Sequence, residues 1–182
     1  MTLLGAVDDA TGKIVALLFR PSEDQTGYLL LLRAIALTYG LPMAIYHDRH
    51  TILRSPKQPT LDDELAGTEP MSQIQRLLAE LGIESIPAYS PQAKGRVERL
   101  WGTLQDRLVK EIAIAGITTM EGANSFLPGF IERYNARFAK APTDPESAWV
   151  TLPKDLDLTY HFAVRESRTV RGDNCIQWQG RL

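Results

Sequence analysis

The sequence predicts an α/β fold, a sheet flanked by helices. Short apolar runs typical of buried strands alternate with longer segments whose apolar residues recur at helical spacing. Gly and Pro residues mark most boundaries between these segments. The predicted order is strand–strand–helix–strand–loop–helix–strand–helix, followed by a second long helix and β-like segments. With 182 residues, 44% of them hydrophobic, the chain can build one core-bearing domain with a small extension.

The first 40 residues predict a hairpin followed by a helix. Residues 2–8 and 13–20 are short apolar runs, and residues 9–12 between them have the composition of a tight turn. Two strands joined by such a turn form an antiparallel hairpin. A helix is then expected over residues 24–39, with an acidic cap at its start and Gly40 at its end.

The middle of the chain predicts a parallel-type unit with a long loop. A continuous apolar strand is expected over residues 43–46, and it leads into the polar run 47–50. Residues 54–70 contain several Pro, Gly and acidic residues, which indicates a long loop. A helix over 71–81 and a short strand over 83–88 follow. Polar residues at the carboxyl end of a strand are where open α/β sheets place their chemistry.

The C-terminal half predicts two long helices and then a change of character. The helices are expected over about 92–115 and 119–140, before a Pro-containing stretch ends the helical pattern. Residues 160–164, 167–170 and 175–178 have strand-like composition. Three such strands would be the beginning of a small β module.

Composition and charge exclude several classes of protein. There is no apolar run of roughly 18 residues, no visible secretory signal, and one cysteine, Cys175, so neither a membrane span nor an internal disulfide is expected. The net charge is −2, yet it is uneven: residues 1–90 carry 7 Lys/Arg and 11 Asp/Glu, whereas residues 91–182 carry 13 and 11. Nucleic acid would therefore meet a local basic patch on the second half, although a solvated helix face explains the same residues.

Two carboxylates are candidates for metal-dependent phosphoryl transfer. Asp48 ends the third predicted strand, and Glu98 lies in the first turns of a later helix. A sheet edge flanked by a helix can bring together carboxylates from distant parts of a chain, and oxygen ligands suit Mg²⁺ or Mn²⁺. The simpler interpretations are a turn or cap for Asp48 and a salt bridge with Lys94 for Glu98.

One segment carries a recognisable family signature. It is Tyr89-Ser90-Pro91-Gln92-Ala93-Lys94-Gly95-Arg96-Val97-Glu98-Arg99, which joins a Pro-Gln turn, a small-basic-Gly step, an apolar residue and the acid. Together with LLGAVDDATGKIVALLFR and PMAIYHDRHTIL, it resembles the catalytic core of the D,D,E transposases and retroviral-type integrases, most closely the bacterial insertion-sequence branch. The resemblance covers about residues 2–140.

This resemblance implies a fold and a function. The fold would be RNase H-like, and the reaction would be metal-dependent nicking and transfer of DNA strands. Asp48 and Glu98 match the family's second and final catalytic acids, and as metal ligands they would bind Mg²⁺ or Mn²⁺. The expected partners are DNA, both element ends and target, and further copies of the chain; the expected location is the bacterial cytoplasm, at the nucleoid.

The chain departs from the family pattern at its start. The family's first catalytic Asp lies on a strand that would precede residues 2–8, and Asp8 and Asp9 match the hairpin turn instead. We therefore expect residues 1–141 to be a catalytic core without its first strand, residues 142–158 a linker, and residues 159–182 the start of a C-terminal β domain. The alternatives are an inactive relic that binds DNA or an intact transposase, and a nuclease of the same fold.

The other candidate residues surround Glu98 and Asp48. Lys94, Arg96 and Arg99 are expected to contact the DNA backbone. Trp101 is expected to pack in the core rather than stack on bases. His47 and His50 could suggest zinc, but the chain has no second cysteine to complete such a site.

Overall fold

A computed structural model gives the architecture of the chain. It describes residues 1–48, 51–53, 55, 64–65, 67, 70–88, 91–166, 168, 170 and 172–177, and for residues 91–97 it describes the backbone alone. The elements in chain order are β1 (Thr2–Val7), β2 (Ile14–Arg20), α1 (Gln25–Tyr39), β3 (Leu41–Pro42), β4 (Ala44–His47), α3 (Gln73–Glu80), β5 (Glu84–Pro87), α4 (Pro91–Ile114), α5 (Met120–Phe138), β6 (Trp149–Val150) and α6 (Leu158–His161).

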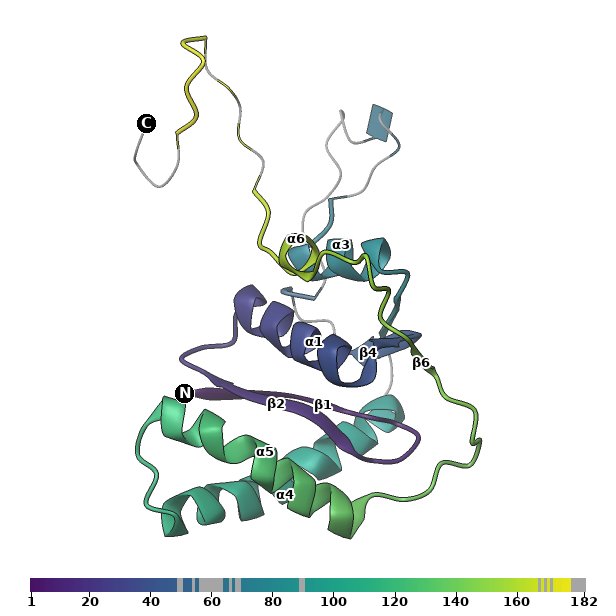
Figure 1. Ribbon diagram of the computed structural model, residues 1–182, viewed down its shortest axis with the longest axis vertical. Helices are drawn as coiled ribbons and strands as arrows, with labels where there is room; N and C mark the ends of the chain where they lie inside the picture. The colour runs from purple at the N-terminus through teal and green to yellow at the C-terminus, as the bar shows by residue number, and fades with distance from the viewer. Residues whose placement is uncertain are drawn as a thin grey trace.

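The hairpin β1–β2 lies in the middle of a layered structure (Figure 1). On one face it packs against α4 and α5, in a cluster of buried residues that joins the two helices to β2. The buried members are Ile14, Leu17, Phe19, Leu100, Leu104, Leu108, Ala123, Leu127 and Phe130. Leu100, Leu104 and Leu108 thus form the apolar face of α4.

Helix α1 covers the other face of the hairpin and has apolar residues on two sides. Leu31 and Ile35 pack with Leu4 and Ala16 of the hairpin. Leu29 and Ala36 join a second cluster with α3, Ile83 and Phe162. Asp24 caps the helix by accepting a hydrogen bond from the Gly27 N–H, at 2.8 Å. The order of layers is therefore α4 and α5, hairpin, α1, and then α3 with α6 (Figure 1).

The strands form three separate pairs. β1 and β2 are antiparallel, β4 and β5 are parallel, and β3 pairs with β6 antiparallel. The mixed α/β class is confirmed. The one mixed sheet that we predicted is absent from the described residues, because no described strand pairs with both the hairpin and the β4–β5 unit. None of the described helices is long and apolar enough to cross a bilayer.

The C-terminal prediction needs two corrections. The strand expected over residues 160–164 is wrong: residues 158–161 form α6, because the Asp157 carboxylate accepts hydrogen bonds from the N–H groups of Thr159 and Tyr160 and so starts a helix. Residues 142–158, expected to be a linker, contain β6, which is paired to the core. The strands expected over 167–170 and 175–178 lie partly outside the described residues, and their described members are not in strands.

Candidate functional site

Asp48 lies at the carboxyl end of β4, as its sequence position predicted. The strand is paired in parallel with β5, and His47 lies opposite Pro87. The imidazole of His47 bridges the neighbouring groups: its Nδ1 lies 2.5 Å from the Asp48 carbonyl oxygen, and its Nε2 lies 2.8 Å from Ser85 Oγ. His47 is thus engaged in tying the end of β4 to β5. His50, its proposed zinc partner, lies outside the described residues.

Tyr28 of α1 lies close enough to Asp48 to feel its charge, and the sequence did not identify this neighbour. The Tyr28 hydroxyl donates a hydrogen bond to Glu23 Oε1 at 2.5 Å. Burial raises the pKa of Tyr28 well above its usual range, and the hydrogen bond to Glu23 and the negative charges of Glu23 and Asp48 raise it further. The tyrosine hydroxyl therefore stays protonated beside two carboxylates. No motif joins Glu23, Tyr28 and Asp48 in the sequence, so only the folded chain reveals this neighbourhood.

Glu98 lies on the exposed face of α4. The opposite face of the helix carries Leu100, Leu104 and Leu108, each at most 5% exposed, which pack on β2 and α5. The Glu98 carboxylate makes no hydrogen bond or ion pair with another residue that the structure describes, Asp48 included. The described contacts do not join it to Asp48.

The basic residues of this helix are only partly defined. The side chains of Lys94 and Arg96 lie outside the described part of the chain. Arg99 is exposed and forms no ion pair with a described residue. Lys110, farther along the helix, pairs with Asp106 one turn before it. Arg99 therefore carries a free positive charge on the described part of α4.

Trp101 packs against the hairpin, as expected. It lies among the partly buried residues of the cluster formed by β2, α4 and α5. Its ring covers Gly5 of β1, where an added Cβ would lie 3.2 Å from Trp101 Cη2. A glycine at this position allows the indole to lie close to the strand. The indole is thus in use as a packing group.

The described residues do not contain a complete metal site. Across the part of the chain that the structure defines, no group of three or more His, Cys, Asp and Glu side chains is arranged to hold a metal ion. Asp48 and Glu98 have the oxygen donors that suit Mg²⁺ or Mn²⁺.

The chain is similar to two curated proteins that are both named as transposases. The chain is 45% identical over 141 residues to "Putative transposase y4bF" of Sinorhizobium fredii, a match that covers 78% of this chain and 30% of the relative. It is 34% identical over 178 residues to the "Transposase for insertion sequence IS1202" of Streptococcus pneumoniae, covering 97% of this chain and 37% of the relative. The chain thus spans about a third of the length of these curated relatives. No protein-family model matches it. The chain is homologous to insertion-sequence transposases.

Proposed function

We propose that this chain is the greater part of the catalytic core of a DNA transposase, with an RNase H-like fold. The observation that carries the proposal is the 34% identity to an insertion-sequence transposase, which extends over 97% of the chain. The hairpin, α1, the parallel β4–β5 pair and the long helix α4 follow in the order that the resemblance implies. The activity would be the nicking of DNA strands and their transfer to a target.

Asp48 and Glu98 are the proposed metal ligands. Asp48 lies at the end of β4, and Glu98 is the exposed acid of the signature segment on α4. A bound Mg²⁺ or Mn²⁺ would polarise the phosphate and lower the pKa of an attacking water. The first catalytic acid of the family would lie on a strand outside these residues. β1 pairs with β2 alone among the described strands, so its other edge has no described strand partner.

DNA is the proposed partner, and its backbone would contact Lys94, Arg96 and Arg99. The test is the affinity of the chain for a fluorescent DNA duplex, measured by anisotropy between about 50 and 200 mM salt. The proposal predicts binding that weakens linearly on a log–log plot. An absence of binding at about 50 mM salt would contradict it. Because transposases act on paired DNA ends, we further propose that copies of the chain assemble on DNA.

The alternative function is a relic that binds DNA without cutting it. It is favoured by one observation: among the residues that the structure describes, no group of three or more His, Cys, Asp and Glu side chains could hold a metal ion. Incubation of supercoiled plasmid with the chain and Mn²⁺ tests for the enzyme. Nicking that is lost in Asp48→Asn supports the enzyme, whereas DNA binding without nicking is expected both of the relic and of a core whose first acid lies outside these residues. Nicking without strand joining would instead indicate a nuclease.

A further inference from the structure

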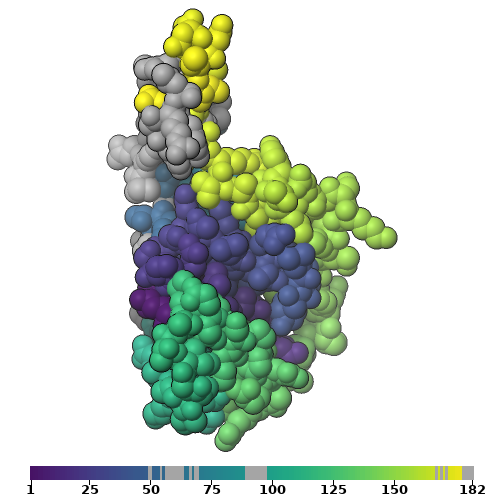
Figure 2. Space-filling model, turned by 60° about the vertical axis from the view of Figure 1, so that its left-hand side comes forward, coloured from purple at the N-terminus to yellow at the C-terminus, as the bar shows by residue number. Residues whose placement is uncertain are grey.

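The segment from Trp149 to Glu166 runs back across the core instead of leaving it. Figure 2 shows residues of this segment, in yellow-green, against the blue atoms that follow α1. Its first anchor is β6, in which Trp149 pairs with Pro42 and Val150 pairs with Leu41. The Trp149 ring also lies 5.4 Å from that of Tyr39, centroid to centroid. The start of the segment is thus fixed at the end of α1.

Gly40 makes this first anchor possible. Its φ of 95° lies in the region that favours glycine, and a Cβ added there would lie 2.3 Å from the Val150 carbonyl oxygen. Any side chain at this position would push the segment away. The sequence therefore accommodates close approach of β6 at the residue that ends α1.

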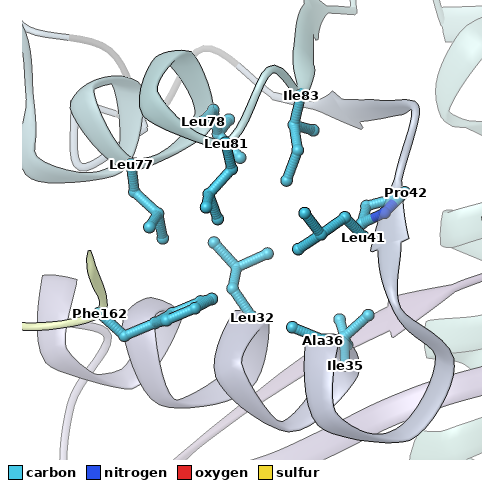
Figure 3. Close-up of a pocket in the computed structure, with 10 residues that line it drawn as sticks. All are labelled: Leu32, Ile35, Ala36, Leu41, Pro42, Leu77, Leu78, Leu81, Ile83 and Phe162. Atoms are coloured by element: carbon cyan, nitrogen blue, oxygen red, sulfur yellow. The ribbon is translucent and has the colours of Figure 1, made fainter. Parts of the chain in front are cut away.

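The second anchor is Phe162, at the end of α6. It is 8% exposed and lines a small apolar pocket with residues of α1, β3, α3 and the start of β5 (Figure 3). In the close-up the ring lies beside Leu32 of α1 and below Leu77 of α3. Phe162 thus fills space between two helices that belong to the core. Burial of a phenylalanine side chain away from water is favourable, so this contact favours the docked state.

The third anchor is polar and converges on Glu80, at the C-terminal end of α3. Arg165 Nη1 donates to Glu80 Oε1 at 2.7 Å, and its Nη2 lies 3.2 Å from Oε2. His161 Nδ1 lies 3.1 Å from Oε2. Arg76, one turn earlier on α3, donates to the same oxygen at 3.1 Å. One carboxylate therefore joins three basic groups, two of which belong to the docked segment.

Helix α3 also binds the backbone of the segment. Gln73 Nε2 donates to the Arg165 carbonyl at 2.6 Å, and the Arg165 N–H donates to Gln73 Oε1 at 3.0 Å. Arg76 Nη2 donates to the Ala163 carbonyl at 3.0 Å. The Arg165 guanidinium lies over the Tyr160 ring, 3.7 Å from its centroid. Side chains of α3 therefore both donate hydrogen bonds to the backbone of the segment and accept one from it.

Two buried polar atoms of this third anchor have no hydrogen-bond partner among the described residues. The Nε atoms of Arg76 and Arg165 are both buried, and neither has a hydrogen-bond partner in the described structure. A buried donor without a partner costs free energy that is recovered when water reaches it. These two unpaired donors therefore offset part of the stability that the hydrogen bonds of the third anchor provide, which favours reversible opening.

We propose that residues 149–166 form a releasable clasp that holds the chain following the core against α3, with the Glu80 carboxylate as its lock. When the clasp is closed, the residues after Glu166 start from the α3 side of the molecule, opposite α4 and α5. When Glu80 loses its bond to Arg165, α6 and Phe162 leave α3 while the hairpin and its helices stay folded. None of the clasp residues is a proposed catalytic or DNA-binding residue, so the clasp stands or falls separately from the proposed function.

Hydrogen exchange of the whole 182-residue chain, followed by mass spectrometry, tests the clasp. Wild type should protect the amides of residues 158–165, and Glu80→Gln should speed their exchange about tenfold without changing exchange in β2 and α5. The matched control is Glu111→Gln. Glu111 lies on α4, away from the clasp, and its Oε2 lies 2.8 Å from Arg133 Nη2. This control should leave residues 158–165 protected.

Two results would overturn the clasp. One is wild-type exchange in residues 158–165 as fast as in an unstructured peptide. The other is equal exchange in Glu80→Gln and Glu111→Gln. If Glu80→Gln unfolds the whole chain, Arg165→Met opens the same bond from the side of the segment, and failure of that variant to raise exchange in 158–165 also contradicts the proposal.

Discussion

The amide side chain of Asn135 on α5 makes both possible backbone hydrogen bonds to Ile14, the first residue of β2. The Ile14 N–H donates to Asn135 Oδ1 at 2.8 Å, and Asn135 Nδ2 donates to the Ile14 carbonyl at 2.9 Å. Asn124 repeats the arrangement with Phe19, at 2.8 and 3.1 Å. The spacings match, since eleven residues of helix and five of strand both rise about 16 Å. Helix α5 thus satisfies the edge of β2 as a neighbouring strand would.

The first prediction concerns this edge. Asn135→Asp keeps the acceptor for the Ile14 N–H but replaces the donor with a second acceptor, so the Ile14 carbonyl faces a negative charge. We expect the free energy of unfolding to fall by about 1–3 kcal/mol, measured by urea denaturation. Gln105→Glu, an equivalent change at an exposed position of α4, should cost much less. Equal losses in the two variants would show that the paired amide is unimportant.

The second prediction separates steric conflict from backbone strain at Gly40. Gly40→Ala forces a Cβ against the Val150 carbonyl, whereas Gly82→Ala, at φ 67°, has nothing within 4 Å of the added atom. Gly82→Ala should cost only the left-handed strain, about 1–2 kcal/mol. Gly40→Ala should cost more in the same urea experiment. It should also expose Val150 to exchange. A smaller loss for Gly40→Ala than for Gly82→Ala would contradict the anchoring of β6.

The third prediction is a pH dependence centred on Glu80. Partial burial by itself raises the pKa of Glu80, but hydrogen bonds from His161, Arg76 and Arg165 outweigh burial, so the pKa lies below its ordinary value of 4.5. Such a group stabilises the folded state fully above the unfolded pKa, and the stabilisation is lost as the pH falls through the folded pKa.

The measurement is the unfolding free energy of wild type and Glu80→Gln between pH 7 and pH 3. The difference between the two proteins should shrink as the pH falls below the ordinary glutamate pKa, because protonated Glu80 resembles glutamine. A difference that stays constant down to about pH 3 would show that the charge of Glu80 does not hold the clasp.

The fourth prediction concerns the basic residues of α4. If Lys94 contacts a DNA phosphate, Lys94→Ala should reduce the slope of log affinity against log salt by about 0.9. Lys110→Ala, on the same helix, removes a charge that is already paired with Asp106, so its slope should change less. Identical slopes for the two variants would place the DNA elsewhere on the molecule.

The sequence predicts the local elements well, because each has a signal within a few residues. The hairpin, α1, β4, α3, β5, α4 and α5 all occur near their expected positions. Asp24, predicted as a cap, accepts the Gly27 N–H. These features depend on periodicity, glycine and side-chain caps, which are written in consecutive residues.

The errors occur where distant residues decide the structure. Residues 160–164 have strand-like composition, yet the segment becomes α6 because Asp157 caps it and Phe162 packs between α1 and α3. The cap at Asp157 could have been predicted from the local sequence. The clasp could not, because Glu80 and Arg165 are 85 residues apart. The two-residue strands β3 and β6 likewise exist only because the folded core places them side by side.

The candidate site also combines features that follow from the local sequence with features that depend on distant residues. The positions of Asp48 at a strand end and Glu98 on a helix follow from local pattern, and the folded chain has both residues there. The proximity of Tyr28 to Asp48 depends on how the folded chain places α1 and β4, which no short motif encodes. Whether Asp48 and Glu98 act together stays a prediction.

The most direct test of the proposed metal site is the binding of Mn²⁺ to the purified chain, measured by isothermal titration calorimetry. If Asp48 and Glu98 hold one ion, wild type should bind Mn²⁺ weakly at a single site. Asp48→Asn and Glu98→Gln should each abolish that binding, and the double variant should be no worse than either. Binding that persists unchanged in both single variants would contradict the proposal that these two carboxylates form the catalytic metal site.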